Sequence, residues 1–492
     1  MQSQILSYFP RRANPRPGQI HTLTTLEQNW DKGDVFVVVL ATGGGKSLIA
    51  ETIMRWANSQ GKRSCTVVPN NVLLEQYIKG NPKLQTLRAK EHYTCSTSST
   101  ELYRVSCDGH SKMAKGKEKG KQFCKGCPYV AANRKVRAVP HYVVNTWTYM
   151  AHKLHQPVVV FDEAHSLLGM VREFAGKRLW QKDVPYPYNL KTYKDLSSWI
   201  AKSKKLYPQL EELDRDLRRP KSFYLVEKAT EPLRGKMENC LKLLPIDTRN
   251  TPPFLWPKGP RGVQKVVLLS ATISPQDIEQ LGLAGRRVVW IESPAPIPAK
   301  QRPVISPSPG FRLGFDASKE ELGRAAAEVD RLAHLHRHER GVIHLTYGLM
   351  DAFMPLLSED TRKRLISHDR ENKTERYKAF LEGPSDSILF CAGLQEGIDL
   401  PGDLGRWQVI AKVPWPSLGE PAWKYVAESD PVRYMWETMR VVLQASGRVC
   451  RGPEDYGITY ILDRSFNNLD MTLAPTWFRE GLVDMEHKEI ER

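Results

Sequence analysis

The 492-residue chain lacks three features that would assign it to other classes of protein. Its longest apolar runs, such as residues 35–41, fall far short of the ~20 residues that a membrane-spanning helix requires. Residues 1–10 contain no basic segment followed by an apolar run, so no secretory signal is expected. Eight cysteines are too few for a disulfide scaffold in a chain of this length. We therefore expect a cytoplasmic protein with reduced thiols and no membrane partner.

Acidic residues are also in the minority, which leaves an excess of positive charge. The chain has 72 Lys and Arg residues against 55 Asp and Glu residues, a formal net charge of +17. Its 41% hydrophobic and 26% charged residues are typical of a folded globular protein. The excess favours a polyanionic partner, of which nucleic acid is the most common, although a basic surface that only confers solubility would look the same. The motifs have to distinguish these two interpretations.

A glycine-rich loop directly follows the first strongly apolar segment. Residues 34–40 predict a buried strand, and the sequence from Leu40 onward matches a phosphate-binding loop except that Leu40 replaces the first glycine. The loop residues are Thr42, Gly43, Gly44, Gly45, Lys46 and Ser47. Glycines let backbone N–H groups approach phosphate oxygens, while Lys46 would contact the β- and γ-phosphates and Ser47 would bind Mg²⁺. A turn without a ligand is the alternative, but the position between a strand and a helical pattern favours nucleotide binding.

Two adjacent carboxylates follow another strand of buried type, residues 157–161. Asp162 suits a magnesium ligand, and Glu163 suits the base that orients an attacking water. By itself the segment 162–165 could be an exposed acidic turn. Together with Lys46 it predicts hydrolysis of a nucleoside triphosphate.

A polar segment near the end of the chain supplies the positive charge that such a reaction needs. Gln444 opens it, and Arg448 and Arg451 follow three residues apart, a spacing that places both on one face of a helix. From there the arginines can stabilise charge that develops on the γ-phosphate. The ordinary alternative is a solvated helix face.

Alternating strand and helix patterns predict an α/β protein with two lobes built on parallel sheets. Strands of the first lobe are expected at residues 34–40, 66–69, 142–145, 157–161 and 265–269, and those of the second near 341–345, 387–391, 408–413 and 457–462. The proline-rich stretch 293–303 is predicted to link the lobes. Two segments interrupt the first lobe: a region rich in cysteine and lysine, 88–137, and a charged region of helical pattern, 167–244.

The ordered set of motifs resembles that of superfamily-2 helicases, and more narrowly that of the XPD/DinG-like iron–sulfur helicases. The matching segments are residues 9–10, 16–19, 42–47, 68–70, 162–165, 270–273, 395–402, 444–451 and 455–457. The resemblance implies two RecA-like motor lobes, with ATP in the cleft between them and single-stranded DNA across both. It also implies that Gln19 reads the adenine edge and that residues 270–272 couple hydrolysis to lobe movement. Gly397 and Asp399 would link the second lobe to the nucleotide and the strand.

A cluster of cysteines interrupts the first lobe. Four of the eight, Cys95, Cys107, Cys124 and Cys127, are separated by 11, 16 and 2 intervening residues. Such a cluster predicts a metal site, and the spacing alone favours structural zinc. The resemblance implies a [4Fe–4S] cluster instead, with zinc as the alternative occupant. The lysine-rich run 112–125 inside this region is either a solvated charge run or a phosphate-contacting wedge.

The resemblance also divides the chain into domains. The first RecA-like lobe is expected at residues 1–87, 141–166 and 261–298, the last of these including the linker. The iron–sulfur cluster domain is expected at 88–140, a small helical, arch-like insertion at 167–260, and the second RecA-like lobe at 299–492. Basic residues of the insertion would then line a channel for the strand, namely Lys202, Lys204, Lys205, Arg215, Arg218, Arg219 and Lys221.

We therefore expect an ATP-dependent DNA helicase that moves 5′ to 3′ along single-stranded DNA and unwinds duplex at single-strand–duplex junctions. Its expected cofactors are ATP, Mg²⁺ and the [4Fe–4S] cluster, and the motor is expected to be a monomer from a bacterial cell or a phage. Two alternatives remain open. One is a helicase that acts on RNA or R-loops. The other is an ATP-gated DNA-binding or protein-displacing translocase that does not unwind.

Overall fold

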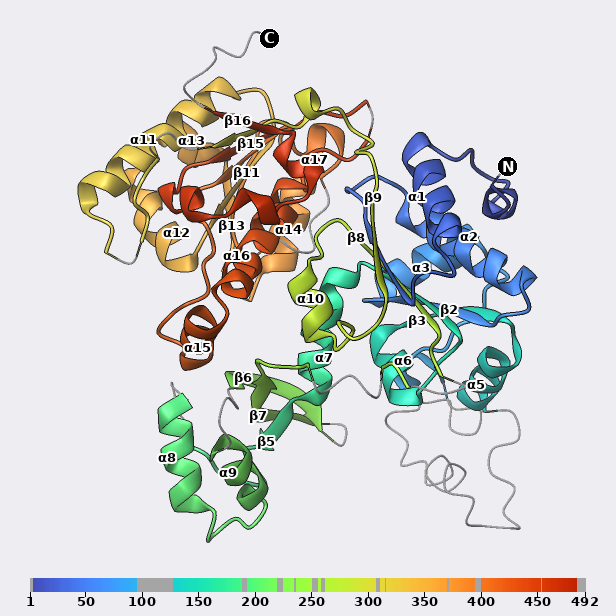
Figure 1. The fold of residues 1–492 in the computed structure, drawn as a ribbon. Helices are drawn as coiled ribbons and strands as arrows, with labels where there is room; N and C mark the ends of the chain where they lie inside the picture. The colour runs from blue at the N-terminus through green and yellow to red at the C-terminus, as the bar shows by residue number, and fades with distance from the viewer. Residues whose placement is uncertain are drawn as a thin grey trace.

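The computed structural model contains two parallel β-sheets side by side, with a smaller domain beneath them (Figure 1). It describes residues 3–94, 127–187, 193–218, 224–233, 236–249, 255–257, 262–306, 310–314, 316–369, 371–393, 400–452 and 454–484. The first lobe lies on the right of Figure 1, mostly in blue and cyan with its last part in yellow-green, and the second lobe lies on the left in yellow to red. The smaller domain follows the carboxylate segment in the chain and is drawn in green.

The first lobe is built on a six-stranded sheet in which every pair of neighbouring strands is parallel. Its order is β3-β2-β4-β8-β1-β9. The strands are β1 (Val35–Val39), β2 (Ser64–Val68), β3 (His141–Asn145), β4 (Val158–Asp162), β8 (Lys265–Ser270) and β9 (Val288–Glu292). Alternate residues of β1 enter two separate hydrophobic clusters, Val37 one and Val38 the other, so the sheet is buried on both faces. This explains the continuous apolar runs that predicted these strands.

Helices cover both faces of the first sheet. They are η1 (Ile5–Tyr8), α1 (Pro17–Gln28), α2 (Lys46–Ser59), α3 (Asn71–Gly80), η2 (Lys90–His92), α5 (Pro128–Ala138), α6 (Thr146–His152), η3 (Ala164–Ser166) and α10 (Pro275–Gln280). Because the strands are parallel, the phosphate-binding loop after β1 and the carboxylates at the end of β4 lie at the same edge of the sheet. The topology therefore brings together the two motifs that the sequence placed more than a hundred residues apart.

The second lobe contains a seven-stranded sheet, again with parallel neighbours, in the order β12-β13-β11-β14-β15-β10-β16. The strands are β10 (Val304–Ser306), β11 (Gly341–Leu345), β12 (Leu365–Ser367), β13 (Ile388–Ala392), β14 (Trp407–Ile410), β15 (Ile458–Ile461) and β16 (Leu482–Asp484). The α-helices are α11 (Lys319–Leu335), α12 (Tyr347–Phe353), α13 (Glu359–Arg364), α14 (Lys373–Glu382), α15 (Pro421–Ser429), α16 (Pro431–Ser446) and α17 (Thr476–Arg479). Single 3₁₀ turns are η5 (Ala299–Gln301), η6 (Met354–Leu356), η7 (Gly402–Leu404), η8 (Arg464–Asn468) and η9 (Met471–Leu473). The strands predicted for this lobe are confirmed to within a few residues.

The insertion after the carboxylates is not simply helical, which corrects the prediction for this region. It contains α7 (Leu167–Ala175), β5 (Lys177–Trp180), α8 (Tyr193–Ser203), α9 (Leu210–Arg218), β6 (Tyr224–Leu233) and β7 (Lys236–Pro245). The three strands form an antiparallel sheet in the order β5-β7-β6. Leu241 and Leu243 pack into the cluster that the helices share, whereas Lys242 between them pairs with Glu173 and Glu231 on the other face. These strands were not predicted because the charged residues on their outer face made the alternation of apolar and polar residues hard to recognise.

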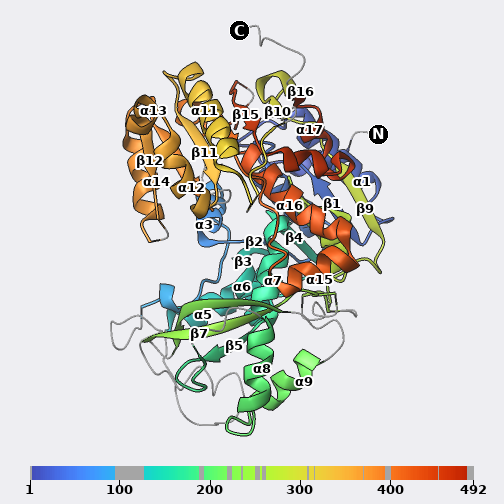
Figure 2. The ribbon, with the colours of Figure 1, turned by 90° about the vertical axis from the view of Figure 1, so that its left-hand side faces the viewer.

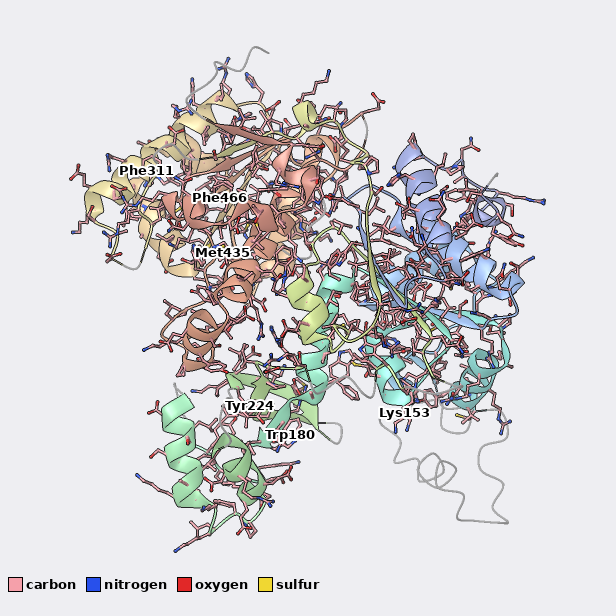
Figure 3. The ribbon with its side chains drawn as sticks, viewed as in Figure 1. Lys153, Trp180, Tyr224, Phe311, Met435 and Phe466 are labelled. Atoms are coloured by element: carbon pink, nitrogen blue, oxygen red, sulfur yellow. The ribbon has the colours of Figure 1, made fainter. Side chains whose placement is uncertain are left out.

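The lobes and the insertion are packed together rather than loosely connected. One hydrophobic cluster runs from Ile278 and Leu281, on and just after α10 of the first lobe, to Trp436 and Met439 on α16 of the second. The insertion lies below both lobes in Figures 1 and 2, and Ile246, which follows β7, packs against Ala422 and Val426 of α15. In Figure 3 the insertion residues Trp180 and Tyr224 lie below Met435 of α16. Within the described parts of the chain, no helix combines the length and apolar character needed to cross a membrane.

Candidate active site

The phosphate-binding loop depends on two glycines in the left-handed region. Gly43 has a φ of 78° and Gly45 has a φ of 77°, a conformation that favours glycine. A Cβ on Gly43 would also lie 2.5 Å from the main-chain oxygen of Arg451 in the second lobe, so this glycine permits the close approach of the two lobes. Leu40, which replaces the usual first glycine, is buried, and its side chain fills the space beneath Gly44. The departure from the motif is therefore accommodated in the core of the first lobe.

Residues at the start of α1 hold this loop in place. The Gln19 side chain is buried and donates a hydrogen bond to the main-chain oxygen of Gly45 at 3.1 Å. Gln19 also accepts a bond from the Arg16 backbone at 2.9 Å, and the Arg16 guanidinium donates to the oxygen of Gly43 at 2.7 Å. Gln19 thus supports the phosphate-binding loop directly, and contact with an adenine edge stays a prediction.

Lys46 begins α2 and joins the two motifs of the first lobe. Its side chain is buried, and Nζ lies 3.0 Å from Oε1 of Glu163. Ser47, the next residue, is exposed. The loop and the carboxylates therefore meet as predicted, with the lysine between the loop and Glu163.

The two carboxylates differ in their surroundings. Asp162 is buried and accepts a hydrogen bond from the Tyr77 hydroxyl at 2.7 Å. Burial and the adjacent Glu163 charge raise the pKa of Asp162 to about 6. Burial also opposes ionisation of Glu163, but Lys46, His165 and Arg448 more than offset it, and the pKa of Glu163 is lowered. The site thus keeps Glu163 ionised, while Asp162 forms no ion pair with any residue that the structure describes.

The backbone and a histidine fix the direction of Glu163. Glu163 has a φ of 51°, which is uncommon for a residue with a side chain and is typical of strained functional positions. His165 Nδ1 lies 3.4 Å from Oε2 of Glu163 and 3.1 Å from the hydroxyl of Ser270. Burial lowers the pKa of His165 to about 4, so this ring is neutral near pH 7. A neutral histidine therefore connects the carboxylate to the segment that was predicted to couple hydrolysis to lobe movement.

The second lobe places its polar segment against the first lobe, but not in the predicted conformation. Helix α16 ends at Ser446, so Arg448 and Arg451 lie on the loop beyond it and do not share a helix face. Gly447 ends the helix and comes so close to the first lobe that a Cβ there would lie 3.2 Å from the Thr42 hydroxyl. The prediction failed because a three-residue spacing fits many loop conformations as well as a helix.

Arg448 and Gln444 nevertheless belong to the site. The charge of Arg448 contributes to lowering the pKa values of both Glu163 and His165. Gln444 is buried, and within the described parts of the chain neither polar atom of its side chain has a hydrogen-bond partner. The Arg451 backbone N–H donates to Asp455 at 2.9 Å. Buried polar atoms usually have partners, so the Gln444 amide is a candidate contact for a bound ligand.

A second group of charges, which the sequence did not predict, connects the lobes beside this site. We call Arg172, Asp277, Glu437 and Arg440 the interlobe cluster. Arg172 on α7 lies 2.9 Å from Glu437 on α16, and Arg440 on α16 contacts both Glu437 and Asp277 of α10, the latter at 3.2 Å. The Trp436 indole donates to Asp277 at 2.8 Å. The only trace of the cluster in the sequence is the Glu437–Arg440 spacing, which is common on exposed helices.

Several predicted site residues fall outside the described residues. They are Gly397 and Asp399 of the second lobe, Cys95, Cys107 and Cys124 of the cysteine cluster, the lysine-rich run 112–125, and Arg219 and Lys221 of the insertion. Cys127, the fourth cysteine, is described; it is buried at the N-cap of α5 and belongs to the core of the first lobe. In the insertion, Lys202, Lys205 and Arg215 are exposed, and Lys204 pairs with Asp214 at 2.7 Å.

Comparisons with known proteins agree with this arrangement. A family model described as the helicase C-terminal domain matches residues 331–481, in the second lobe. A family model described as the res subunit of type III restriction enzymes matches residues 12–182, most of which lie in the first lobe. The helicase subunit XPD/RAD3 of general transcription and DNA repair factor IIH, from Saccharomyces cerevisiae, is 26% identical over 150 residues. That match takes in 27% of this chain and spans only 19% of the yeast protein.

Solved structures resemble the whole chain. An XPD helicase structure superposes with a TM-score of 0.64 at 14% identity and covers 96% of this chain and 100% of its own. The structure of Xpd4 from S. tokodaii superposes with a TM-score of 0.58 at 12% identity, with the same coverage of 96% and 100%. At such identities the likeness concerns the fold. It confirms the prediction of two RecA-like lobes with parallel sheets.

Proposed function

We propose that this chain, which is an XPD-like superfamily-2 helicase, uses ATP hydrolysis to move along single-stranded DNA and to separate duplex ahead of it. The observation that carries the proposal is the convergence at Glu163. Lys46 from the phosphate-binding loop lies 3.0 Å from this carboxylate, and Arg448 from the second lobe is near enough to lower its pKa. A phosphate group bound at this point would touch both lobes, so its hydrolysis can change how they are held together.

The first-lobe residues suit ATP with a divalent cation. Lys46 and the loop N–H groups would hold the β- and γ-phosphates. Asp162 and Ser47 would hold Mg²⁺, which supplies positive charge to the phosphate oxygens. The raised pKa of Asp162 fits this assignment, because a carboxylate beside a second carboxylate gains most from an added cation. Glu163 would accept the proton of the attacking water, and it becomes available when Lys46 turns to the phosphates.

The second lobe would sense the γ-phosphate. Arg448 would stabilise negative charge on that group, and Gln444, whose two polar atoms have no partner among the described residues, would contact it or the attacking water. The close approaches of Gly43 to the Arg451 backbone and of Gly447 to Thr42 require the lobes to be closed. We expect ATP to favour this closed arrangement and product release to favour an open one.

A [4Fe–4S] cluster held by Cys95, Cys107, Cys124 and Cys127 is part of the proposal. Cys127 supports it in one respect: its position at the N-terminus of α5 suits a negatively charged sulfur ligand, because the helix dipole is positive there. Its burial in the first-lobe core would fix the cluster relative to the motor. DNA as the substrate, 5′-to-3′ movement and unwinding at junctions rest on the family resemblance and on the net charge of +17.

Replacement of Glu163 tests the hydrolytic assignment. The Glu163→Gln variant should bind ATP but lose turnover, and Glu428→Gln, which changes an exposed carboxylate of α15, serves as the matched control. ATPase should be measured without nucleic acid, with single-stranded DNA and with RNA of the same sequence. Unchanged turnover in Glu163→Gln would contradict its role as the base. Turnover of the unmodified protein that neither strand stimulates would contradict the motor, and greater stimulation by RNA would favour the RNA alternative.

The cluster requires a separate measurement. Anaerobic purification followed by iron and sulfide analysis should give about four of each per chain, as a [4Fe–4S] cluster requires. A colourless protein with stoichiometric zinc would show that the cysteines hold the alternative metal. This result would leave the motor assignment intact, because the ATPase assay tests it independently.

A further inference from the structure

A second basic cavity lies at the opposite edge of the first sheet from the candidate active site. It has a volume of about 570 Å³ and is formed by the end of η1 and the residues that follow it, the last turns of α2 and the first residue of β3. The lining residues are Ser7, Tyr8, Phe9, Arg11, Arg12, Arg55, Asn58, Ser59 and His141. Since α2 has 14 residues and begins at Lys46, its far end lies roughly 20 Å from the phosphate-binding loop. The cavity is therefore separate from the proposed ATP site.

Positive charges outnumber negative ones around this cavity. Arg11, Arg12 and Arg55 contribute three guanidinium groups, and the buried Glu51 holds two of them, those of Arg12 and Arg55. Arg12 and Arg55 both pair with Glu51, and Asn81 also donates to it at 3.1 Å, so its oxygens are fully engaged. Arg11 is exposed and forms no ion pair or hydrogen bond with any residue that the structure describes. Glu51 thus fixes two guanidiniums in place while an excess of two positive charges remains.

Unused hydrogen-bonding groups line the same space. Nδ1 of His141 is buried and has no partner among the residues whose positions are described. Burial and the nearby Arg55 lower the pKa of His141, so the ring is neutral near pH 7 and can donate from Nδ1. The Tyr8 hydroxyl and the Asn58 amide also form no hydrogen bond within the described parts of the chain. These donors surround a volume within the usual ligand range of roughly 300–1,000 Å³.

We propose that this cavity binds a phosphate group of a phosphorylated ligand. Guanidinium groups match the planar array of phosphate oxygens, and a phosphate monoester carries about −1.5 to −2 charges at pH 7, close to the local excess. The same chemistry is offered by a small free phosphate compound and by the terminal phosphate of a nucleic-acid strand. Either ligand would contact the first lobe at a point remote from ATP hydrolysis.

Calorimetric titration of the full-length Lys46→Ala protein with pyrophosphate tests the proposal, because this background weakens binding at the ATP site. We expect pyrophosphate to bind, and expect Arg11→Ala in the same background to weaken that binding by about tenfold or more. His141→Phe, which keeps the ring but removes Nδ1, should weaken it several-fold. Arg362→Ala, at an exposed arginine of α13, should leave it unchanged. Thermal melting should confirm that every variant is folded.

The two ligand sources are separated by a second titration with a 5′-phosphorylated single-stranded oligonucleotide and its 5′-hydroxyl counterpart. A loss of the preference for the 5′-phosphate in Arg11→Ala supports a strand end as the ligand. A loss confined to pyrophosphate supports a small phosphorylated compound. Absence of pyrophosphate binding in Lys46→Ala, or equal binding by the Arg11→Ala and Arg362→Ala proteins, overturns the proposal. These titrations measure binding and not ATPase, so a negative result would overturn the phosphate site without affecting the motor assignment.

Discussion

The candidate active site and the interlobe cluster both place charges between the lobes, but they differ in whether each buried carboxylate is paired with a cation. In the interlobe cluster, Glu437 lies between the guanidiniums of Arg172 and Arg440. Burial opposes ionisation of Glu437, yet the two arginines more than offset it and lower its pKa to about 2. In the active site, Asp162 lies beside a second carboxylate, and its pKa rises to about 6. The carboxylate of the interlobe cluster is paired without a ligand, whereas Asp162 of the active site forms no ion pair with any residue that the structure describes.

This difference separates a structural role from a functional one. Matched and hydrogen-bonded charges at an interface fix how two bodies dock, and removal of one partner leaves the other charge buried and unpaired. Unmatched charges cost stability in the free protein, and a ligand with the missing charge recovers that cost on binding. The interlobe cluster therefore helps to fix the geometry in which the lobes meet, whereas in the proposed function the active site is where Mg²⁺ and a nucleotide would change the contacts between the lobes. Four substitutions and one titration test this comparison.

Removal of a matched charge should have the largest effect on folding. Glu437→Gln leaves Arg172 and Arg440 facing a neutral amide, so we expect the free energy of unfolding to fall by about 3–5 kcal/mol. Urea denaturation measures this change, with the exposed Glu428→Gln as the control. A loss below about 1 kcal/mol would show that the cluster behaves like an ordinary surface ion pair.

Removal of the active-site lysine should act on turnover instead. Lys46→Ala should lower single-stranded-DNA-stimulated ATPase by about 10²–10³-fold or more, as is usual when a group that stabilises transition-state charge is lost. Its unfolding in the absence of nucleotide should change little, because the Glu163 partner is 31% exposed. Lys378→Ala, on an exposed part of α14, is the control. A large loss of stability with normal turnover would reverse the comparison.

Neutralisation of the unmatched carboxylate should stabilise the free protein. Asp162→Asn removes a carboxyl group whose pKa is raised to about 6 in the folded protein. Keeping this group ionised at pH 7 therefore costs the folded protein about 2–3 kcal/mol of stability. The Tyr77 hydroxyl can still donate to the amide oxygen. We expect a higher melting temperature without ligand and no magnesium-dependent turnover. A lower melting temperature would show that Asp162 is not destabilising in the free state.

The stability contributions of Asp162 and Glu437 should also depend on pH in opposite directions. The folded protein binds a proton on Asp162 more tightly than the unfolded chain does, so the Asp162→Asn advantage should shrink as the pH falls from about 7 to about 4. Glu437 has a lowered pKa, so its stabilising contribution is complete above about pH 4.5 and is lost only as the pH falls toward 2. Melting temperatures of the Asp162→Asn and Glu437→Gln variants and of the unmodified protein from about pH 2.5 to pH 7 measure both trends. Parallel trends in the two variants would contradict the distinction.

The smallest expected effect on folding concerns the unpartnered amide of Gln444. Gln444→Met should leave the free energy of unfolding unchanged or raise it by up to about 1 kcal/mol, because neither polar atom forms a hydrogen bond in the described parts of the chain. Gln408→Met is the matched control, since that buried amide contacts His344 and Thr459 and its loss should cost about 1–3 kcal/mol. Similar losses in both variants would mean that Gln444 has a structural partner. Turnover should fall in Gln444→Met if the amide contacts the nucleotide.

Local patterns in the sequence predicted most of the motor and misjudged two regions. Continuous apolar runs such as residues 35–39 gave the strands, because both faces of each sheet are covered. The antiparallel strands at Tyr224–Leu233 and Lys236–Pro245 were missed, because charged residues on their outer face resembled a helical charge pattern. The arginines after Ser446 were placed on a helix, because spacing alone does not show where a helix ends.

The sequence by itself determined the chemistry that neighbouring residues create. The phosphate-binding loop with Lys46, and the Asp162–Glu163 pair, follow directly from short segments at the ends of apolar strands. Only the tertiary structure decided which distant groups meet them. Arg448 influences Glu163 from the second lobe, and the interlobe cluster joins Asp277 to Glu437. The physical reason is that local order depends on residues a few positions apart, whereas burial, charge matching and pKa depend on neighbours that packing brings together.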